Sequence, residues 1–320
     1  MALRTDLTEM FGIEHPVMLA PMGGVAGGEL AAAVSEGGGL GLIGAGGGDP
    51  DVLDRECGLL AERTERPWGI GLLSWATDLD AVLRIVERRP AAIMLSFGDP
   101  APYTDAVLAA DIRLLVQVTT SDEAARALDA GAHVLVAQGG EAGGHGGTRG
   151  TLPFVPAIVD LAGPVPVLAA GGIADGRGLA AALVLGAAGA LIGTRFEATH
   201  EALISAAQAK AIVDADAGDT ERNRIIDIAR DSAWPAEYTA RTLRNGFLDE
   251  WHGRESELAA DSAARQRYLD ATGRGDLDYV PTWAGEAVGL IDGLESAADL
   301  VGRISGGAEQ VIRRTAGRCG

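Results

Sequence analysis

The chain has 320 residues, of which 47% are hydrophobic and 22% charged, so it can bury a large core and does not have a disordered composition. Its formal net charge of −19 repels phosphate backbones and anionic lipid headgroups, which excludes nucleic acid and membrane surfaces as expected partners. The lack of a signal-like or membrane-spanning apolar segment favours a cytoplasmic protein. Cys57 and Cys319 lie far apart in the sequence and indicate neither a disulfide framework nor a zinc site.

Residues 17–194 alternate short apolar runs with amphipathic, alanine-rich segments, which is the pattern of repeated strand–helix units. Eight parallel strands joined by helical crossovers close a barrel, whereas a doubly wound sheet more often stops at about five to seven. The pattern therefore favours the α/β class and a (β/α)8 TIM barrel. The predicted strands are Val17–Ala20, Leu40–Ile43, Trp68–Leu73, Ala92–Ser96, Ile112–Val118, His133–Ala137, Val165–Ala170 and Ala190–Ile192.

The pattern changes after the eighth predicted strand. Residues from about Glu201 to Gly320 are predicted to be helical; one part supplies the eighth barrel helix and the remainder packs over the barrel mouth. We therefore divide the chain into a barrel core, residues 1–214, and a C-terminal helical extension near the barrel mouth, residues 215–320.

Two glycine-containing turns follow the seventh and eighth predicted strands, at the end of a barrel where active sites lie. Gly171, Gly172 and Gly193 lack side chains that would hinder a phosphate from approaching backbone N–H groups, and Thr194 adds a hydroxyl donor. The pattern predicts a phosphate site, although glycines in these positions would also suit plain tight turns.

A further glycine pattern, Gly39, Gly41 and Gly44, matches G-x-G-x-x-G. The match begins inside the second predicted strand, and no helix starts directly after it. We interpret this segment as a strand and its exit loop and not as a dinucleotide site.

His145 lies between glycines in the loop after the sixth predicted strand. No apolar helix or strand face explains it, and the loop leads to the barrel mouth, so it is the candidate catalytic residue; a solvent-exposed loop histidine is the alternative. Glu141, four residues earlier, either orients the loop or the imidazole, or is a solvated loop carboxylate.

Together these segments resemble the nitronate monooxygenase family, formerly called 2-nitropropane dioxygenases. The similarity covers nearly the whole chain, and its most specific part is Gln138-Gly-Gly-Glu141-Ala-Gly-Gly-His145. The other matching segments are Ala20–Met22, Ala170–Gly176, Gly193–Phe196, Arg241–Asn245 and Trp283–Gly285.

The resemblance implies an FMN-containing barrel that oxidises alkyl nitronates with dioxygen to a carbonyl compound and nitrite. His145 matches the family's active-site histidine beside the flavin. The loop from Ala20 to Gly23 would lie against the isoalloxazine, and Gln117 would bond the flavin ring or ribityl chain, although some relatives carry lysine there. The FMN-binding residues implied are Ala20, Pro21, Met22, Gly23, Gln117, Gln138, Gly144, Ala170, Gly171, Gly172, Gly193 and Thr194.

Two other functions remain open at this stage. The family includes flavin enoyl-ACP reductases and NADH:quinone reductases, so an NAD(P)H-dependent reductase of quinones or enoyl thioesters is an alternative. A non-catalytic FMN-binding redox protein is another, but His145 argues against it because a pure binder has little need of a titratable group beside the flavin.

The acidic chain favours a nitronate over a nicotinamide as the electron donor, unless Arg195, Arg241 or Arg244 faces the mouth and binds a pyrophosphate. The expected partners are a small-molecule substrate and dioxygen. A homodimer is one of the assemblies that the sequence allows.

Overall fold

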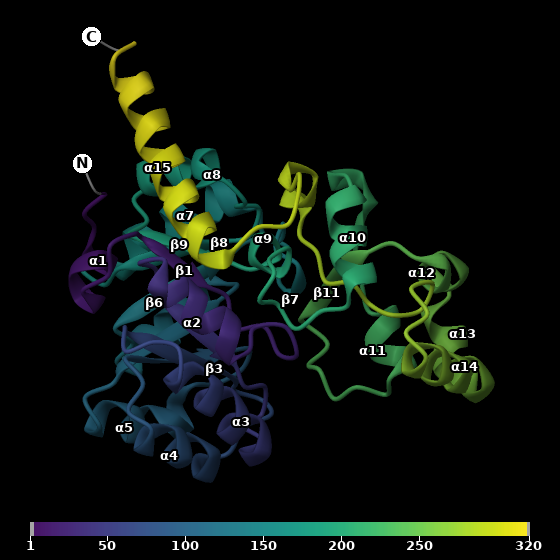
Figure 1. Ribbon diagram of the computed structural model, residues 1–320. Coiled ribbons are helices and arrows are strands. Elements are labelled where there is room, and N and C mark those ends of the chain that lie inside the picture. The colour runs from purple at the N-terminus through teal and green to yellow at the C-terminus, as the bar shows by residue number, and fades with distance from the viewer. Residues whose placement is uncertain (1–2, 319–320) are drawn as a thin grey trace.

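The computed structural model describes residues 3–318 and contains a closed barrel with a smaller cap beyond one end (Figure 1). The eight barrel strands are parallel and follow the order β1-β9-β8-β6-β5-β4-β3-β2. A bridge between Met18 and Leu40 closes the ring between β1 and β2. The strands are β1 (Val17–Leu19), β2 (Gly41–Gly44), β3 (Trp68–Leu73), β4 (Ala92–Ser96), β5 (Arg113–Val118), β6 (Val134–Gln138), β8 (Val167–Ala170) and β9 (Gly189–Ile192). The predicted (β/α)8 barrel is confirmed. The segment with the Gly39, Gly41 and Gly44 pattern is a strand and its exit loop, as predicted, although the strand spans Gly41–Gly44 and not Leu40–Ile43.

Helices cover the outside of the barrel, and four of the crossover helices begin with a side-chain cap. Asp49, Asp78, Thr120 and Asp175 accept hydrogen bonds from backbone N–H groups in the first turns of their helices, which satisfies donors that a helix leaves unpaired. The helices are α1 (Asp6–Phe11), α2 (Gly28–Glu36), α3 (Pro50–Ala61), α4 (Leu79–Glu87), α5 (Ala101–Ala109), α6 (Ser121–Asp129), α7 (Thr151–Ala162), α8 (Gly176–Val184) and α9 (Thr194–Glu197).

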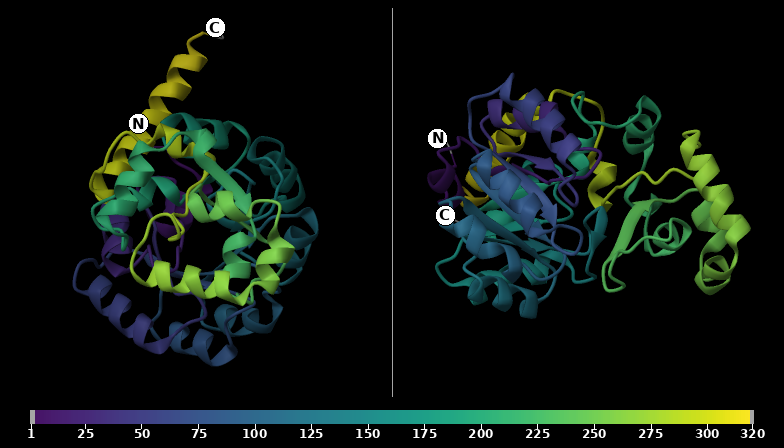
Figure 2. Two further views of the ribbon diagram at one scale, coloured as in Figure 1. Left: turned by 90° about the vertical axis from the view of Figure 1, so that its right-hand side faces the viewer. Right: turned by 90° about the horizontal axis from the view of Figure 1, so that it is seen from below.

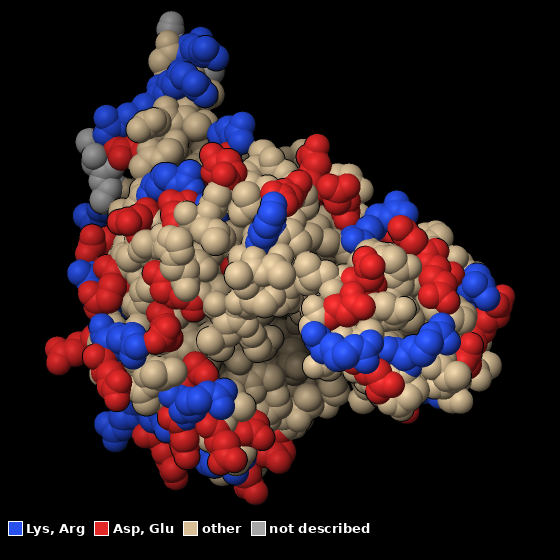
Figure 3. Space-filling view, turned by 45° about the vertical axis from the view of Figure 1, so that its right-hand side comes forward, with Lys and Arg blue, Asp and Glu red and all other residues tan. Residues whose placement is uncertain are grey.

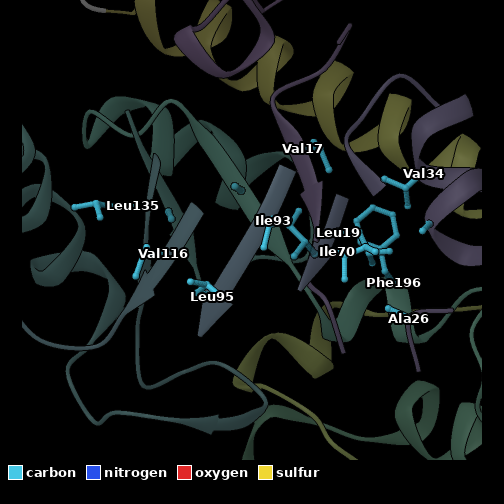
Figure 4. Packing of buried hydrophobic residues seen from close by; sticks show 14 of the residues in the cluster. Val17, Leu19, Ala26, Val34, Ile70, Ile93, Leu95, Val116, Leu135 and Phe196 are labelled. Carbon is cyan, nitrogen blue, oxygen red and sulfur yellow. The ribbon is translucent and has the colours of Figure 1, made fainter. Parts of the chain in front are cut away.

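The barrel core has two layers because side chains alternate along each strand. Met18, Met94 and Leu168 belong to the layer inside the barrel. Ile93, Leu95 and other outward-facing residues pack beneath the helices in the second layer (Figure 4). The parallel strands are therefore buried on both faces, as expected for a barrel ringed by helices.

The helix that completes the barrel comes from the end of the chain. α9 is four residues long, and the outer face beside α8 and α2 is covered instead by α15 (Ala297–Ala316) (Figure 1). Leu300, Val301 and Ile304 of α15 are buried in the outer core layer. The domain boundary at residue 214 stays a prediction, but α15 itself packs with the barrel.

The cap stands over the barrel mouth (Figure 2). It contains α10 (Ala206–Asp214), α11 (Ile225–Ala229), α12 (Gly246–Trp251), α13 (Glu255–Ala260), α14 (Ser262–Gly273) and the short helices η1 (Ala217–Asp219) and η2 (Glu286–Leu290). Phe247, Trp251 and Tyr268 belong to a hydrophobic cluster of its own.

The prediction of helices from about Glu201 to Gly320, interrupted by a loop at Pro281–Gly285, missed two strands. β10 (Thr220–Asn223) and β11 (Thr239–Leu243) form an antiparallel sheet with β7 (Gly144–Gly146), a strand within the glycine-rich barrel loop. The two cap strands are short, and arginines occupy positions in both, so they lack the apolar alternation by which a strand is recognised.

Two smaller observations complete the description. Cys57 is a buried free thiol, whereas Cys319 lies outside the described residues. Between residues 3 and 318, none of the helices combines the length and apolar character needed to cross a bilayer.

A pair of glycine substitutions tests the packing of α15. An added Cβ at Gly176 would lie 2.3 Å from the backbone nitrogen of Ala308, whereas one at Gly306 would meet no atom within 4 Å. We expect Gly176→Ala to lower the free energy of unfolding by about 1–3 kcal/mol through overpacking, and Gly306→Ala to raise it by up to about 1 kcal/mol through better helix propensity. Urea denaturation measures both; equal effects would contradict the close contact of α8 with α15.

Candidate active site

A cavity of about 340 Å³ lies between the carboxyl ends of the barrel strands and the cap. Figure 3 shows a hollow bordered largely by uncharged side chains at this junction. Seven residues predicted for the site line the cavity: Ala20, Pro21, Met22, Gly23, Gln117, Gly144 and His145. The lining also includes Glu197, Arg230 and Trp234, which the sequence did not indicate, and Trp283, which it indicated only as part of a family segment.

The loop after β1 can cross the barrel mouth because β3 carries glycine where the loop passes. A Cβ at Gly71 would lie 2.2 Å from Cγ of Pro21. Met22 and Gly23 are thereby brought to the same cavity wall as the exits of β3 and β5. Position 71 therefore has to be glycine for the loop with Pro21 to pack against β3.

His145 is held at the cavity by a carboxylate from the cap. It lies in β7, opposite Ala240 of β11, and its Nε2 is 2.9 Å from Oδ2 of Asp227 on α11. His145 is 8% exposed and Asp227 is 3% exposed. The solvent-exposed alternative for His145 is therefore wrong.

Burial and the ion pair shift both pKa values. Burial lowers the pKa of His145, and the hydrogen bond and charge of Asp227 oppose this without reversing it. Burial raises the pKa of Asp227, but the bonds from His145 and Arg230 outweigh it, so the net shift is downward. At neutral pH we therefore expect a neutral imidazole beside an ionised carboxylate.

This pairing assigns the tautomer of His145. Since an ionised carboxylate only accepts hydrogen bonds, Nε2 of the neutral ring carries the hydrogen that Asp227 accepts. Nδ1 then bears a free lone pair, and within residues 3–318 it has no hydrogen-bond partner. The imidazole is thus prepared to take a proton at Nδ1.

Aromatic side chains surround the imidazole. The ring of Trp234 stacks on it with centroids 3.6 Å apart and planes 4° apart, and Trp283 lies 5.6 Å away. Trp234 also contacts Trp75 and Phe97 at about 5 Å. These rings restrict the orientation of the imidazole and make this side of the cavity apolar.

Arg222 fixes the backbone of the histidine loop. Its guanidinium, from β10, donates to the carbonyl oxygens of Gly140, Ala142, Gly144 and Gly146 at 2.8–3.5 Å. Burial and then the nearby Arg241 lower the pKa of Arg222 to about 10, so it is still charged at neutral pH. A guanidinium has five N–H donors in one plane and can bind several carbonyl oxygens at once. Arg222 therefore orders the glycine-rich loop that carries His145.

The predicted phosphate residues lie together beside the main cavity. Gly171, Gly172, Gly193 and Thr194 line a smaller hollow of about 60 Å³, together with Ala20 and Ala170, which the resemblance assigned to FMN but not to its phosphate. Gly171 and Gly172 have φ angles of +97° and +73°, which glycine adopts without strain. Ala20 lines both cavities, so the two are adjacent.

Gln138 and Glu141 stabilise the loop and lie away from the cavity lining. Gln138 Nε2 donates to the carbonyl oxygen of His145 at 3.0 Å. The Glu141 carboxylate accepts hydrogen bonds from the N–H and hydroxyl of Thr151 at 2.8–3.0 Å, at the start of α7. Glu141 therefore anchors the loop and does not touch the imidazole.

The three arginines considered for a pyrophosphate are all paired with carboxylates. Arg195, 1% exposed, pairs with Glu295. Arg241 pairs with Glu286 at 2.8 Å, and Arg244 with Asp249 at 2.6 Å. The cation at the main cavity is instead Arg230, whose guanidinium donates to Asp227 and lies over Trp283.

Sequence reasoning missed Asp227, Arg230 and Trp234 because they come from a segment far along the chain. One signal was present: Asp227 interrupts an apolar run, Ile225–Ala229. A lone carboxylate in such a run is buried only when it has a partner. Nothing in the local pattern indicates that the partner is His145.

Comparisons of the sequence and the structure with known proteins identify the family to which the chain belongs. The sequence model of the family described as nitronate monooxygenase matches residues 4–82 and 74–306. The chain belongs to the nitronate monooxygenase family. It is 36% identical to the nitronate monooxygenase npaC of Metarhizium robertsii, over 89% of this chain and 88% of that protein. The chain is accordingly an oxidoreductase of this family.

Solved structures show the same family relationship. FabK from Thermotoga maritima superposes with a TM-score of 0.87 and 30% identity, covering 99% of both chains. A nitroalkane oxidase from Streptomyces ansochromogenes gives a TM-score of 0.79 and 29% identity, over 97% of this chain and 99% of that one. The same fold thus occurs in FabK and in a nitroalkane oxidase.

The His145–Asp227 pair gives a prediction that needs no substrate. Because Asp227 raises the pKa of His145 against the effect of burial, Asp227→Asn should lower it further. Histidine NMR titration measures this, with the resonance assigned by its loss in His145→Ala. The pKa of His133, which burial lowers independently of Asp227, should not move; a rise at His145 would contradict the assignment.

Proposed function

We propose that the two adjacent cavities hold FMN, as expected for a family that is generally flavin-dependent. The chain offers suitable groups: Gln117 lines the main cavity, and its buried Nε2 has no hydrogen-bond partner within the described residues. A ring carbonyl or ribityl oxygen would satisfy this donor. When bound, FMN would supply the redox centre that accepts an electron from the substrate.

The remaining predicted residues suit the other parts of the cofactor. Pro21, Met22 and Gly23 form a wall on which a flat ring could lie. Gly171, Gly172, Gly193 and Thr194 line the smaller hollow, where backbone N–H groups would bind the phosphate. The Thr194 hydroxyl accepts a bond from Gly285 N–H at 2.9 Å. Its own hydrogen has no acceptor within residues 3–318 and could be donated to a phosphate.

Oxidation of alkyl nitronates by dioxygen is the activity we propose. The observation that carries it is the neutral His145, held by Asp227, at the same cavity as Arg230. Nδ1 of His145 would take the α-proton of a neutral nitroalkane, and the Arg230 guanidinium would neutralise the nitronate anion that results. Two nitronates and one dioxygen balance to two carbonyl compounds and two nitrites.

An NAD(P)H-dependent reductase of quinones or enoyl thioesters is the second candidate, and the likeness to FabK favours it. Such an enzyme must bind the pyrophosphate of its donor near the mouth. None of Arg195, Arg241 and Arg244 lines the main cavity, whereas Arg230 does, which supports the nitronate proposal. A flavin-binding protein without turnover would leave the His145–Asp227 pair without a use.

Two forms of one substrate test His145 as the base. His145→Ala should lower kcat/KM for a neutral nitroalkane by about 10²–10⁴-fold, the usual contribution of a general base. The corresponding nitronate has already lost the proton and should be affected much less. The readout is nitrite release with each form, and flavin content shows that the variant keeps its cofactor.

The pH profile supplies the control for this experiment. Because burial lowers the pKa of His145 below 6.5, the rate with neutral nitroalkane should rise through a pKa in that acidic range and reach a plateau near neutral pH. Equal activity of wild type and His145→Ala on both forms would remove His145 from the mechanism.

A further inference from the structure

Glu197 is a buried acid at the main cavity that the proposed reaction has not used. It is the last residue of α9 and lines the cavity, yet it is 2% exposed. Its neighbours in sequence are differently engaged: Phe196 packs in the barrel core (Figure 4), and Arg195 pairs with Glu295. Of these three consecutive side chains, Glu197 is the one at the cavity.

Among the described residues, the carboxyl group of Glu197 has no partner. Within residues 3–318 it takes part in no hydrogen bond and no ion pair. An ionised carboxylate buried in this way is strongly unfavourable, so the group retains its proton. Burial raises the pKa of Glu197 to about 8, and no neighbouring charge contributes to the shift.

The charged groups around Glu197 are already engaged. At the cavity, Arg230 and His145 both contact Asp227. On the segments flanking α9, Glu286 of η2 pairs with Arg241, and Glu201 accepts a bond from the N–H of Ala297 at the start of α15. On the side of the β1 loop, Glu56 accepts from the N–H of Gly28 at 2.7 Å. A hydrogen-bond partner for Glu197 must therefore enter through the cavity.

We propose that Glu197 is a protonated carboxylic acid that donates a hydrogen bond to an oxyanion bound in the cavity. It would act with the Arg230 guanidinium, so that a planar anion meets one permanent cation and one donor that is lost when Glu197 ionises. The inference rests on the proposed function in one respect, because the nitronate head is such an anion. A neutral carboxylic acid kept as a donor at neutral pH is an established use of burial in enzymes.

Nitrate is the probe for this role, because it is a planar oxyanion that neither reacts nor titrates between pH 6 and 10. Its affinity for the flavin-loaded wild type should be constant near neutral pH and fall towards tenfold per pH unit above about pH 8, as expected when one proton is required. Burial lowers the pKa of His145 from its ordinary value of 6.5, so this residue does not titrate above pH 8. Arg222, whose pKa is about 10, is present in wild type and in both variants and affects them alike. Calorimetric titration gives the dissociation constants.

Two variants separate the donor from the charge. Glu197→Gln keeps an N–H donor that does not ionise, so its affinity for nitrate should not change with pH. Glu197→Ala has no donor and should bind more weakly at pH 6.5, where wild type and Glu197→Gln bind alike. The inference is overturned if nitrate affinity at pH 9.5 is the same in wild type and Glu197→Gln.

Infrared spectroscopy of glutamate-labelled protein reads the protonation state without any ligand. A protonated carboxyl band should be present at pH 6.5, disappear by pH 9.5 and be missing from Glu197→Gln; an ionised Glu197 at pH 6.5 overturns the inference. Nitrite release keeps the two proposals apart. If nitronate yields no nitrite while Glu197 behaves as described, only the proposed function fails. If nitronate yields nitrite but nitrate affinity and the infrared band do not change with pH as described, only the role of Glu197 fails.

Discussion

The candidate site depends on one hydrogen bond between two parts of the fold. His145 belongs to a loop of the barrel, and Asp227 belongs to a helix of the cap. The sheet of β7, β10 and β11 joins the two parts and sets their distance. The ring of Trp234, also from the cap, stacks on the imidazole, so the imidazole acquires its tautomer and its lowered pKa only when the cap is docked on the barrel.

The arginine of the same sheet explains why the loop can be rich in glycine and still be ordered. Arg222 binds four carbonyls of the loop, replacing the regular ladder that a longer strand would make. Gln138 bonds the carbonyl of His145 from the barrel side. Glycine allows the close approach of these groups, and charge-assisted hydrogen bonds offset the entropy that glycine loses.

The electrostatics of the cavity differ from those of the molecular surface. The chain carries a net charge of −19, yet the cavity contains a guanidinium, a neutral imidazole and, by the inference above, a neutral acid. Asp227, the carboxylate that pairs with Arg230, does not line the cavity, so a small anion would meet one guanidinium and two groups without charge. The acidic surface therefore says little about the charge of the substrate.

The sequence allowed the barrel to be predicted because its evidence is local. Strands such as Ala92–Ser96 are continuous apolar runs between turn residues, as strands buried on both faces must be. His145 could be found because glycines flank it and no buried face explains it. Asp227, Arg222 and Glu197 could not be assigned, because their importance lies in contacts, or a missing contact, with residues distant in the chain. The strands β10 and β11 are similarly defined by pairing with β7 and not by their own composition.

The central claim is that a nitronate, and not a nicotinamide, reduces a flavin bound at this mouth. Rapid anaerobic mixing of the purified protein with propyl nitronate, NADH and NADPH in turn, while the flavin absorbance is followed, tests it most directly. The account predicts bleaching by the nitronate that is faster than by either nicotinamide, and release of FMN when the protein is denatured by acid. Rapid, saturable bleaching by NADH or NADPH with none by nitronate would contradict it.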